Sequence, residues 1–271
     1  MDEDQPPVDA DKGPIGVVRN ADAHWDRFDP DAYFKANYAS LRTDDAEILS
    51  ITGTHFAQAL SVEGAGARRA IDMGAGVNIY PSMAMLPYCG AITLYEFAQP
   101  NLDWLERERS TGWARSWKDG ADDFWAVLAH LPHGEITAPL DELDKRLEIR
   151  PGSLYDLPAG ERWDLGTMFF VAESITEDPE QFRLGIDRFL ECLVPGAPFV
   201  IALMEHRTNG YHAGTQSFPS TDVGETDIQK YLDLVAQDVS VKHVDVVGHD
   251  PLKDPYGGMV VAWGRTHLFY D

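Results

Sequence analysis

The stretch RAIDMGAG, residues 69–76, constrains the fold more than any other segment of the chain. An apolar run that ends in two closely spaced glycines is typical of a buried strand that turns sharply into a helix. Other short apolar runs follow and alternate with amphipathic stretches. We interpret seven runs as strands: residues 69–73, 91–96, 145–150, 163–171, 197–204, 241–248 and 257–265. This alternation predicts an α/β fold whose mostly parallel sheet is covered by helices on both faces.

The two ends of the chain depart from this alternation. Only residues 249–256 separate the last two apolar runs. This connection is too short for a crossover helix, so it predicts an antiparallel terminal hairpin. Residues 1–20 are acidic and rich in proline, so we expect a disordered leader. Residues 21–66 contain two helix signals before the first strand and predict an N-terminal helical cap. The main domain is expected over residues 67–271, with an insertion at about 106–144.

Charge and cysteine usage exclude several classes of protein. The 271 residues include 22 Lys and Arg against 45 Asp and Glu, a net charge of −23 that repels nucleic acid. Two isolated cysteines, Cys89 and Cys192, make neither a disulfide framework nor a metal site. The leader lacks the pattern of a signal peptide, and the longest apolar run is too short to span a bilayer. We therefore expect a cytoplasmic protein with no membrane or nucleic-acid partner; its oligomeric state carries no sequence signal, and a monomer is compatible.

The glycine turn indicates the kind of ligand. A dinucleotide-binding turn would need a third glycine at position 79, which is Ile79, and the chain has no phosphate-binding P-loop. A less anionic ligand with an adenosine fits better, and S-adenosylmethionine has one together with a zwitterionic amino-acid end. Asp72 is expected to bind its ammonium, and the backbone of Gly74, Ala75 and Gly76 its methionyl part. Glu96 ends the next strand, at the edge where such acids hold ribose hydroxyls.

Several motifs together extend this interpretation to a family. FDPDAYFKANY, IDMGAGVNIY, YEFAQPNLDWLE, LVPGAPFVIALME and GYHAGTQSF occur in this order between residues 25 and 266. In this combination the chain resembles the nicotinamide, phenylethanolamine and thioether (indolethylamine) N-methyltransferases. The resemblance implies the class I methyltransferase fold, a Rossmann-like, seven-stranded, mostly parallel sheet. It also implies S-adenosylmethionine as cofactor and S-adenosylhomocysteine as product.

The resemblance further assigns cofactor contacts by position. Tyr33 and Tyr38 are expected to close over the cofactor, and Tyr80 to contact its methionyl part. Phe97 is expected to contact the adenine, and Asn101 the ribose or the carboxylate. The family usually has an acid after the third strand, near the adenine amine. Here Gly152 and Ser153 occupy that place, so Ser153, the nearby Asp156 or backbone groups are the three options.

The acceptor side is expected after the fourth and fifth strands. Glu173 and Glu205 follow these strands, and in the amine-methylating members of the family acids in both regions contact the amine. They are the candidate catalytic groups, since a carboxylate can bind an amine and accept its proton. His206 is a further candidate because histidine titrates near neutral pH. Tyr211 resembles an aromatic residue of the family's substrate pocket.

The sequence thus predicts a methyltransferase that acts on a small molecule, at an amine or ring nitrogen. The alternatives are transfer to oxygen, sulfur or carbon in specialised metabolism, an enzyme that cyclises or cleaves S-adenosylmethionine, and a binding protein without turnover. The sequence does not distinguish among acceptors.

Overall fold

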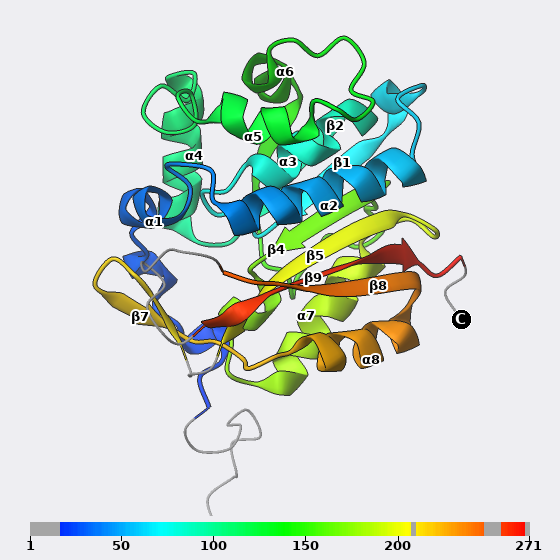
Figure 1. The fold of residues 1–271 in the computed structure, drawn as a ribbon. Coiled ribbons are helices and arrows are strands. Elements are labelled where there is room, and N and C mark those ends of the chain that lie inside the picture. The colour runs from blue at the N-terminus through cyan, green and yellow to red at the C-terminus, as the bar shows by residue number, and fades with distance from the viewer. Residues whose placement is uncertain (1–16, 207–209, 247–255, 269–271) are drawn as a thin grey trace, which may run out of the picture.

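A single sheet organises the molecule in the computed structural model, which describes residues 17–206, 210–246 and 256–268. The described strands of this sheet run in the order β3-β2-β1-β4-β5-β9-β8 (Figure 1). Their bounds are β1 Arg69–Met73, β2 Ala91–Glu96, β3 Leu147–Pro151, β4 Leu165–Phe169, β5 Pro198–His206, β8 Ala236–Val244 and β9 Tyr256–Thr266. β9 pairs antiparallel with β5 and with β8, and the other pairs are parallel. The predicted parallel sheet with an antiparallel terminal hairpin is confirmed.

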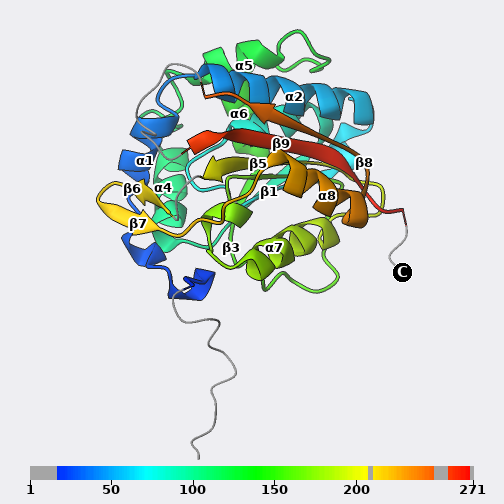
Figure 2. The same ribbon diagram turned by 60° about the horizontal axis from the view of Figure 1, so that its bottom comes forward.

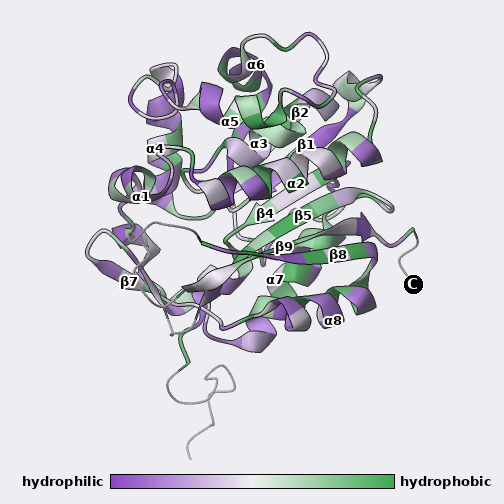
Figure 3. Cartoon of the chain, viewed as in Figure 1, coloured by the Kyte–Doolittle hydropathy of each residue, from purple (hydrophilic) through white to green (hydrophobic). Residues whose placement is uncertain are grey.

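Helices cover both faces of the sheet, as Figures 1 and 2 show. On one face lie α2 Thr43–Ala59, α3 Tyr80–Met85, α4 Gln99–Ser110, α5 Ala121–Leu128 and α6 Pro139–Arg146. On the other lie α7 Pro179–Glu191 and α8 Glu225–Val235. Strand alternation separates the two cores: Val200 and Ala202 of β5 pack with the first set of helices, and Phe199, Ile201 and Leu203 with the second. Figure 3 shows hydrophobic residues concentrated in the central strands.

The N-terminal cap consists of α1 Pro30–Asn37 and α2, with the short 3₁₀ turns Asn20–Asp22 and Trp25–Arg27 before them. Asp29 caps α1, since its Oδ1 accepts a hydrogen bond from the Ala32 N–H at 2.9 Å, and Pro30 follows at the first helical position. A hairpin that the sequence did not predict, β6 Tyr211–Ala213 with β7 Gln216–Phe218, packs against this cap. The rings of Trp25 and Phe218 stack there at 5.0 Å.

The insertion after α4 is part of the main core. Trp113 and Trp117 are buried, and the Trp117 Nε1–H donates to the Val77 carbonyl at 3.0 Å. This bond fastens the insertion to the loop that follows the glycine turn. The remaining 3₁₀ turns are Ala65–Ala67, Leu86–Tyr88 and Ala172–Ser174.

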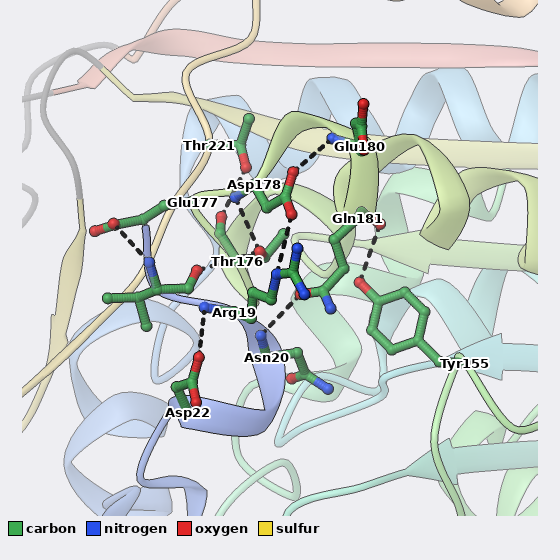
Figure 4. A network of polar contacts seen from close by, with 11 residues as sticks. Arg19, Asn20, Asp22, Tyr155, Thr176, Glu177, Asp178, Glu180, Gln181 and Thr221 are labelled. Atoms are coloured by element: carbon green, nitrogen blue, oxygen red, sulfur yellow. Dashed lines mark hydrogen bonds and ion pairs between the residues drawn. The ribbon is translucent and has the colours of Figure 1, made fainter. Parts of the chain in front are cut away.

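The end of the predicted leader departs from our expectation of disorder over residues 1–20, because residues 18–20 make hydrogen bonds to the main domain. Figure 4 shows residues 18–20 held against the start of α7. The Val18 N–H donates to Glu177 Oε2 at 3.0 Å, and the Glu177 N–H donates to the Val18 carbonyl at 2.8 Å. The Asn20 N–H donates to Gln181 Oε1 at 2.8 Å, and Arg19 Nε lies 3.2 Å from Asp178 Oδ2. The cap is thus joined to the main domain from residue 18 on, while residues 1–16 lie outside the described part. None of the helices in the described part is long and apolar enough to cross a membrane.

Candidate active site

A cavity of about 810 Å³, including the space at its open mouth, lies outside the carboxyl ends of β1, β2 and β4. This is the edge where ligands bind in open α/β sheets. Most of the predicted cofactor residues line it, together with the predicted substrate residue Tyr211: Tyr33, Tyr38, Gly74, Ala75, Gly76, Glu96, Phe97, Asn101, Gly152 and Ser153. The structure therefore brings together side chains from segments that lie far apart in the sequence.

The glycine turn forms one wall of the cavity. Gly74 and Gly76 have φ angles of +65° and +56°, a region that glycine adopts without steric cost. A Cβ on Gly74 would lie 2.5 Å from Val171 Cγ2, so a larger residue would force the turn away from β4. The Gly74 N–H donates to the Tyr95 carbonyl at 2.7 Å, which fixes the turn against β2.

Glu96 fastens the turn from the neighbouring strand. Its Oε2 accepts from the Gly76 N–H at 2.7 Å, and its Oε1 accepts from the N–H groups of Phe97 at 2.9 Å and Ala98 at 2.7 Å. The residue is buried and also bonded to the Asn101 side chain; burial raises the pKa of the carboxyl, while these hydrogen bonds oppose the shift. Glu96 therefore stabilises the backbone of the turn and also lines the cavity.

Two amide groups on the cavity wall have atoms without a partner among the described residues. Asn101 Oδ1 is a buried acceptor and Asn78 Nδ2 a buried donor. An unpaired donor and an unpaired acceptor beside the turn suit a ligand with both charges, such as an amino-acid end. Asn78 is a residue that the sequence analysis missed, although its place two residues after Gly76 was a signal for it.

The far end of the cavity is apolar and open. Phe97 stands at the mouth with 50% of its surface exposed, which leaves a ring face free for a flat ligand group. Among the three options after the third strand, Ser153 and the backbone of Gly152 line the cavity, while Asp156 lies in a separate surface groove.

Aromatic residues of the cap and of the β6–β7 hairpin form the roof. Tyr33 lies 6.1 Å from Tyr38 and 6.4 Å from Tyr211, measured between ring centroids. Trp25 and Phe28 complete this roof. Such rings exclude water and present faces that attract a cation.

Asp72 and Tyr80 do not line the cavity, contrary to our expectation. The Asp72 carboxylate lies beneath the turn and accepts hydrogen bonds from Ser82 Oγ at 2.9 Å and Thr167 Oγ1 at 2.8 Å. Burial raises its pKa to about 7. The Tyr80 hydroxyl donates instead to Asp45 Oδ1 at 3.0 Å. Both side chains support the turn from below, with their polar atoms bonded to protein groups.

Glu173 and Glu205 also lie away from the described cavity lining. Glu173 is fully buried: its Oε1 accepts from the Met204 N–H at 2.9 Å and from Ser174 Oγ at 3.0 Å, and its Oε2 has no partner among the described residues. Burial raises its pKa to about 7. Glu205 is half-buried beside His243, with 3.5 Å between Oε2 and Nε2. The expectation that these acids border the acceptor pocket with Tyr211 is therefore not met. The His206 side chain lies outside the described residues.

The sheet order, the antiparallel β9 and the glycine turn with its acid on the next strand define a class I, S-adenosylmethionine-dependent methyltransferase. Residues 16–119 match the model of the NNMT/PNMT/TEMT family. The chain is 24% identical to human phenylethanolamine N-methyltransferase over 228 residues, 77% of each chain. It is 24% identical to the mouse enzyme of that name over 286 residues, 95% of this chain and 90% of that one. These matches confirm the predicted resemblance to this family.

Solved structures of similar fold include the N-methyltransferase NodS from Bradyrhizobium japonicum WM9 in complex with S-adenosylhomocysteine. It is 13% identical, covers 87% of this chain and 92% of its own, and has a TM-score of 0.49. The glycopeptide N-methyltransferase MtfA, complexed with the same molecule, is 11% identical with a TM-score of 0.48; the match covers 80% of this chain and 89% of that chain.

Proposed function

We propose that this enzyme transfers the methyl group of S-adenosylmethionine to the nitrogen of a small amine. The observation that carries the choice of nitrogen is the similarity to phenylethanolamine N-methyltransferases, which extends over at least 77% of this chain in each of four mammalian relatives. The aromatic roof of the cavity supports it, because ring faces favour a cationic or amine ligand.

The described residues fit the cofactor. Gly74 and Gly76 offer bare backbone to the methionyl part, Asn78 Nδ2 is a donor free for a carboxylate, and Asn101 Oδ1 an acceptor free for an ammonium or a hydroxyl. We assign Glu96 to the ribose and Phe97 to the adenine, and the position of both residues in the cavity lining supports this. When bound, S-adenosylmethionine supplies a methyl group that the amine nitrogen takes with its lone pair, while the carbon–sulfur bond breaks and its electron pair stays on sulfur.

The chain itself has two tasks in such a reaction. It must hold the nitrogen in line with the reacting groups, and it must keep water out. Tyr33, Tyr38 and Tyr211 do the second, because their rings close the cavity from the side opposite the sheet. No covalent intermediate with the protein is required.

A product assay tests the proposal. The purified protein is incubated with S-adenosylmethionine and, separately, with pools of primary and secondary amines (phenylethanolamine among them), phenols, alcohols and thiols, and products are identified by mass spectrometry. We expect methylation in the amine pool, and none with Glu96→Ala, which loses the cofactor grip. Methylation confined to the phenol, alcohol or thiol pools would overturn the choice of nitrogen. Loss of S-adenosylmethionine without any methylated acceptor would indicate a cyclising or cleaving enzyme.

A further inference from the structure

A second, smaller cavity of about 260 Å³ adjoins the first. Tyr33, Tyr38 and Phe170 line both cavities, so these three rings stand between them. The enclosed space is small, so it suits one compact group of a ligand and not a whole ligand molecule. The small cavity is thus a side chamber of the candidate active site.

Phe170 is held in an unusual backbone conformation at this boundary. Its φ is +59°, in the left-handed region that non-glycine residues rarely adopt, and its N–H donates to the Ala202 carbonyl at 2.7 Å. Backbone strain of this kind concentrates at ligand sites. Here it places the ring where the two cavities meet.

Arg42 and Asp45 line the chamber, and Asp44 beside it is a second carboxylate that shares the same cation. Arg42 directs its planar fork at Asp44, with Nε 2.9 Å from Oδ1 and Nη2 2.5 Å from Oδ2. Asp45 is 2% exposed; its Oδ1 accepts from the Tyr80 hydroxyl at 3.0 Å, and its Oδ2 lies 3.9 Å from Arg42 Nε, beyond hydrogen-bond distance. Arg42 thus gives both its hydrogen bonds to Asp44 and only a longer ion-pair contact to Asp45, so two buried carboxylates share one cation at the chamber wall.

The rest of the lining offers no second cation to Asp45. Met204 of β5 and Met259 of β9 bring apolar thioethers, and Asn37 of α1 already donates from its Nδ2 to the Tyr33 carbonyl at 2.9 Å. A buried carboxylate needs a cation, a proton or several hydrogen-bond donors to stabilise it, and Asp45 accepts from one hydroxyl, that of Tyr80.

From this charge imbalance we infer that Asp45 binds the ammonium group of the acceptor, in the chamber beside the cofactor cavity. The ligand class is a small amine that enters as the ammonium and passes one proton to the Asp45 carboxylate, so that its nitrogen has a free lone pair for the methyl group. Its remaining atoms reach past Phe170 toward Tyr211. The inference rests on the proposed function, and it names the acid that this function needs in place of Glu173 and Glu205.

The titration of Asp45 agrees with this role. Burial raises its pKa to about 7, Asp44 adds to the shift, and Arg42 and the Tyr80 hydroxyl oppose it. The other titratable groups in the described lining of the chamber are Arg42, Tyr33 and Tyr38, and burial raises the pKa of Tyr38 well above its usual value. Without a bound cation Asp45 thus takes up a proton near neutral pH, and an ammonium must displace that proton.

Titration calorimetry with two probes tests the inference. Phenylethanolamine carries an ammonium, and 1-phenylethane-1,2-diol replaces that group with a hydroxyl. In the presence of saturating S-adenosylhomocysteine, the wild type should bind the amine more tightly than the diol. Asp45→Asn, which keeps an acceptor for the Tyr80 hydroxyl, should weaken amine binding roughly tenfold to a hundredfold and leave diol binding nearly unchanged.

A matched control shows whether the effect on binding comes from removing a carboxylate in the chamber or from removing any carboxylate. Asp187→Asn removes a carboxylate that also accepts a tyrosine hydroxyl, Tyr231 at 2.6 Å, on α7 and away from both cavities. It should bind both probes as the wild type does. Unchanged S-adenosylhomocysteine affinity of Asp45→Asn shows that the variant is folded. If the variant does not fold, the test uses the wild type alone. The enthalpy of amine binding is then measured between pH 6 and 7 in two buffers of different ionisation enthalpy, and the difference between the two should show that protons are released on binding.

The possible outcomes separate the inference from the proposed function. Equal affinity of the wild type for amine and diol, an amine affinity of Asp45→Asn equal to wild type, or the absence of proton release would each overturn the role of Asp45. If N-methylated products form all the same, the proposed function survives that failure. If the amine preference depends on Asp45 but only oxygen or sulfur acceptors are methylated, the inference holds and the choice of nitrogen fails.

Discussion

Replacing Glu96 by glutamine is the sharpest test of the cofactor site, because the carboxylate has two roles that the structure separates. Its two oxygens accept three backbone N–H groups, from Gly76, Phe97 and Ala98, and it also borders the cavity. Glutamine keeps one acceptor oxygen and places an NH₂ group where the other oxygen was. In either orientation that NH₂ group faces a backbone N–H, and at least one buried donor loses its partner.

The size of both effects follows from the hydrogen bonds. A bond to a charged group contributes about 1.5–3 kcal/mol, so Glu96→Gln should lose about that much unfolding free energy. For a chain of this size the loss corresponds to a fall of roughly 3–10 °C in Tm. Losing the bond to a ribose hydroxyl should raise the dissociation constant of S-adenosylhomocysteine roughly tenfold to a hundredfold, which calorimetry measures directly.

A ligand comparison isolates the ribose role from the loosening of the turn. The wild type should prefer adenosine to 2′,3′-dideoxyadenosine, and Glu96→Gln should lose that preference. Glu161→Gln is the control: it removes a carboxylate bonded to Arg69 and Arg150 away from the cavity, so it should lower Tm and leave ligand affinity unchanged. If Glu96→Gln kept its preference for adenosine, the carboxylate would act on the backbone alone, and the ribose assignment would be refuted.

Three other predictions follow from the same structure. Deleting residues 1–42 removes no strand but removes part of the roof, so circular dichroism should show a folded sheet while S-adenosylhomocysteine binding weakens; equal binding would make the cap irrelevant to the cofactor. Because burial raises the folded-state pKa of Asp72 from 3.8 to about 7, the folded state binds more protons than the unfolded state in that range, and stability falls as pH rises through it. In urea unfolding, the free energy of unfolding of Asp72→Asn should therefore fall less between pH 5 and pH 8 than that of the wild type. An equal fall in both proteins would contradict a raised pKa of the buried Asp72 carboxyl. Glu173→Gln and Glu205→Gln should keep an acceptor KM near that of the wild type, since neither carboxylate lines the described cavities; a large rise in steady-state assays would restore them as acceptor ligands.

The parts of the fold that could be predicted are those fixed by short-range sequence. β1 and β2 have the predicted bounds because each is a short apolar run ended by a turn or by a helix start. The antiparallel β9 followed from the short connection before it. The convergence of the glycine turn and Glu96 needed one further step, that neighbouring parallel strands end at the same sheet edge. Local pattern and a general rule of topology were sufficient.

The orientation of individual side chains could not be predicted in the same way. Asp72 is the fourth residue of β1 and its partners, Ser82 and Thr167, lie 10 and 95 residues away in the sequence. No local pattern states that these hydroxyls would hold it beneath the turn. Asp45 was missed for the opposite reason, because an acid in the first turn of a helix is commonly explained by the helix dipole alone. The sequence does not show that Asp45 is buried, nor that Arg42 gives its hydrogen bonds to Asp44 instead.

The floor and the roof of the cavity are held by different kinds of interaction. The floor rests on short hydrogen bonds among Gly74, Gly76, Tyr95 and Glu96, each with a fixed direction. The roof rests mainly on ring contacts at 5.0–6.4 Å, which are worth about 0.5–1.5 kcal/mol each and tolerate sliding. The roof is therefore held by less directional contacts than the floor. The hydrogen bonds of residues 18–20 to the start of α7 hold the segment that precedes the roof residue Trp25, and Figure 4 shows the contacts of Arg19 and Asn20. The directional bonds of the floor keep the glycine turn in one shape, which a site needs when it must hold its ligand in a fixed position.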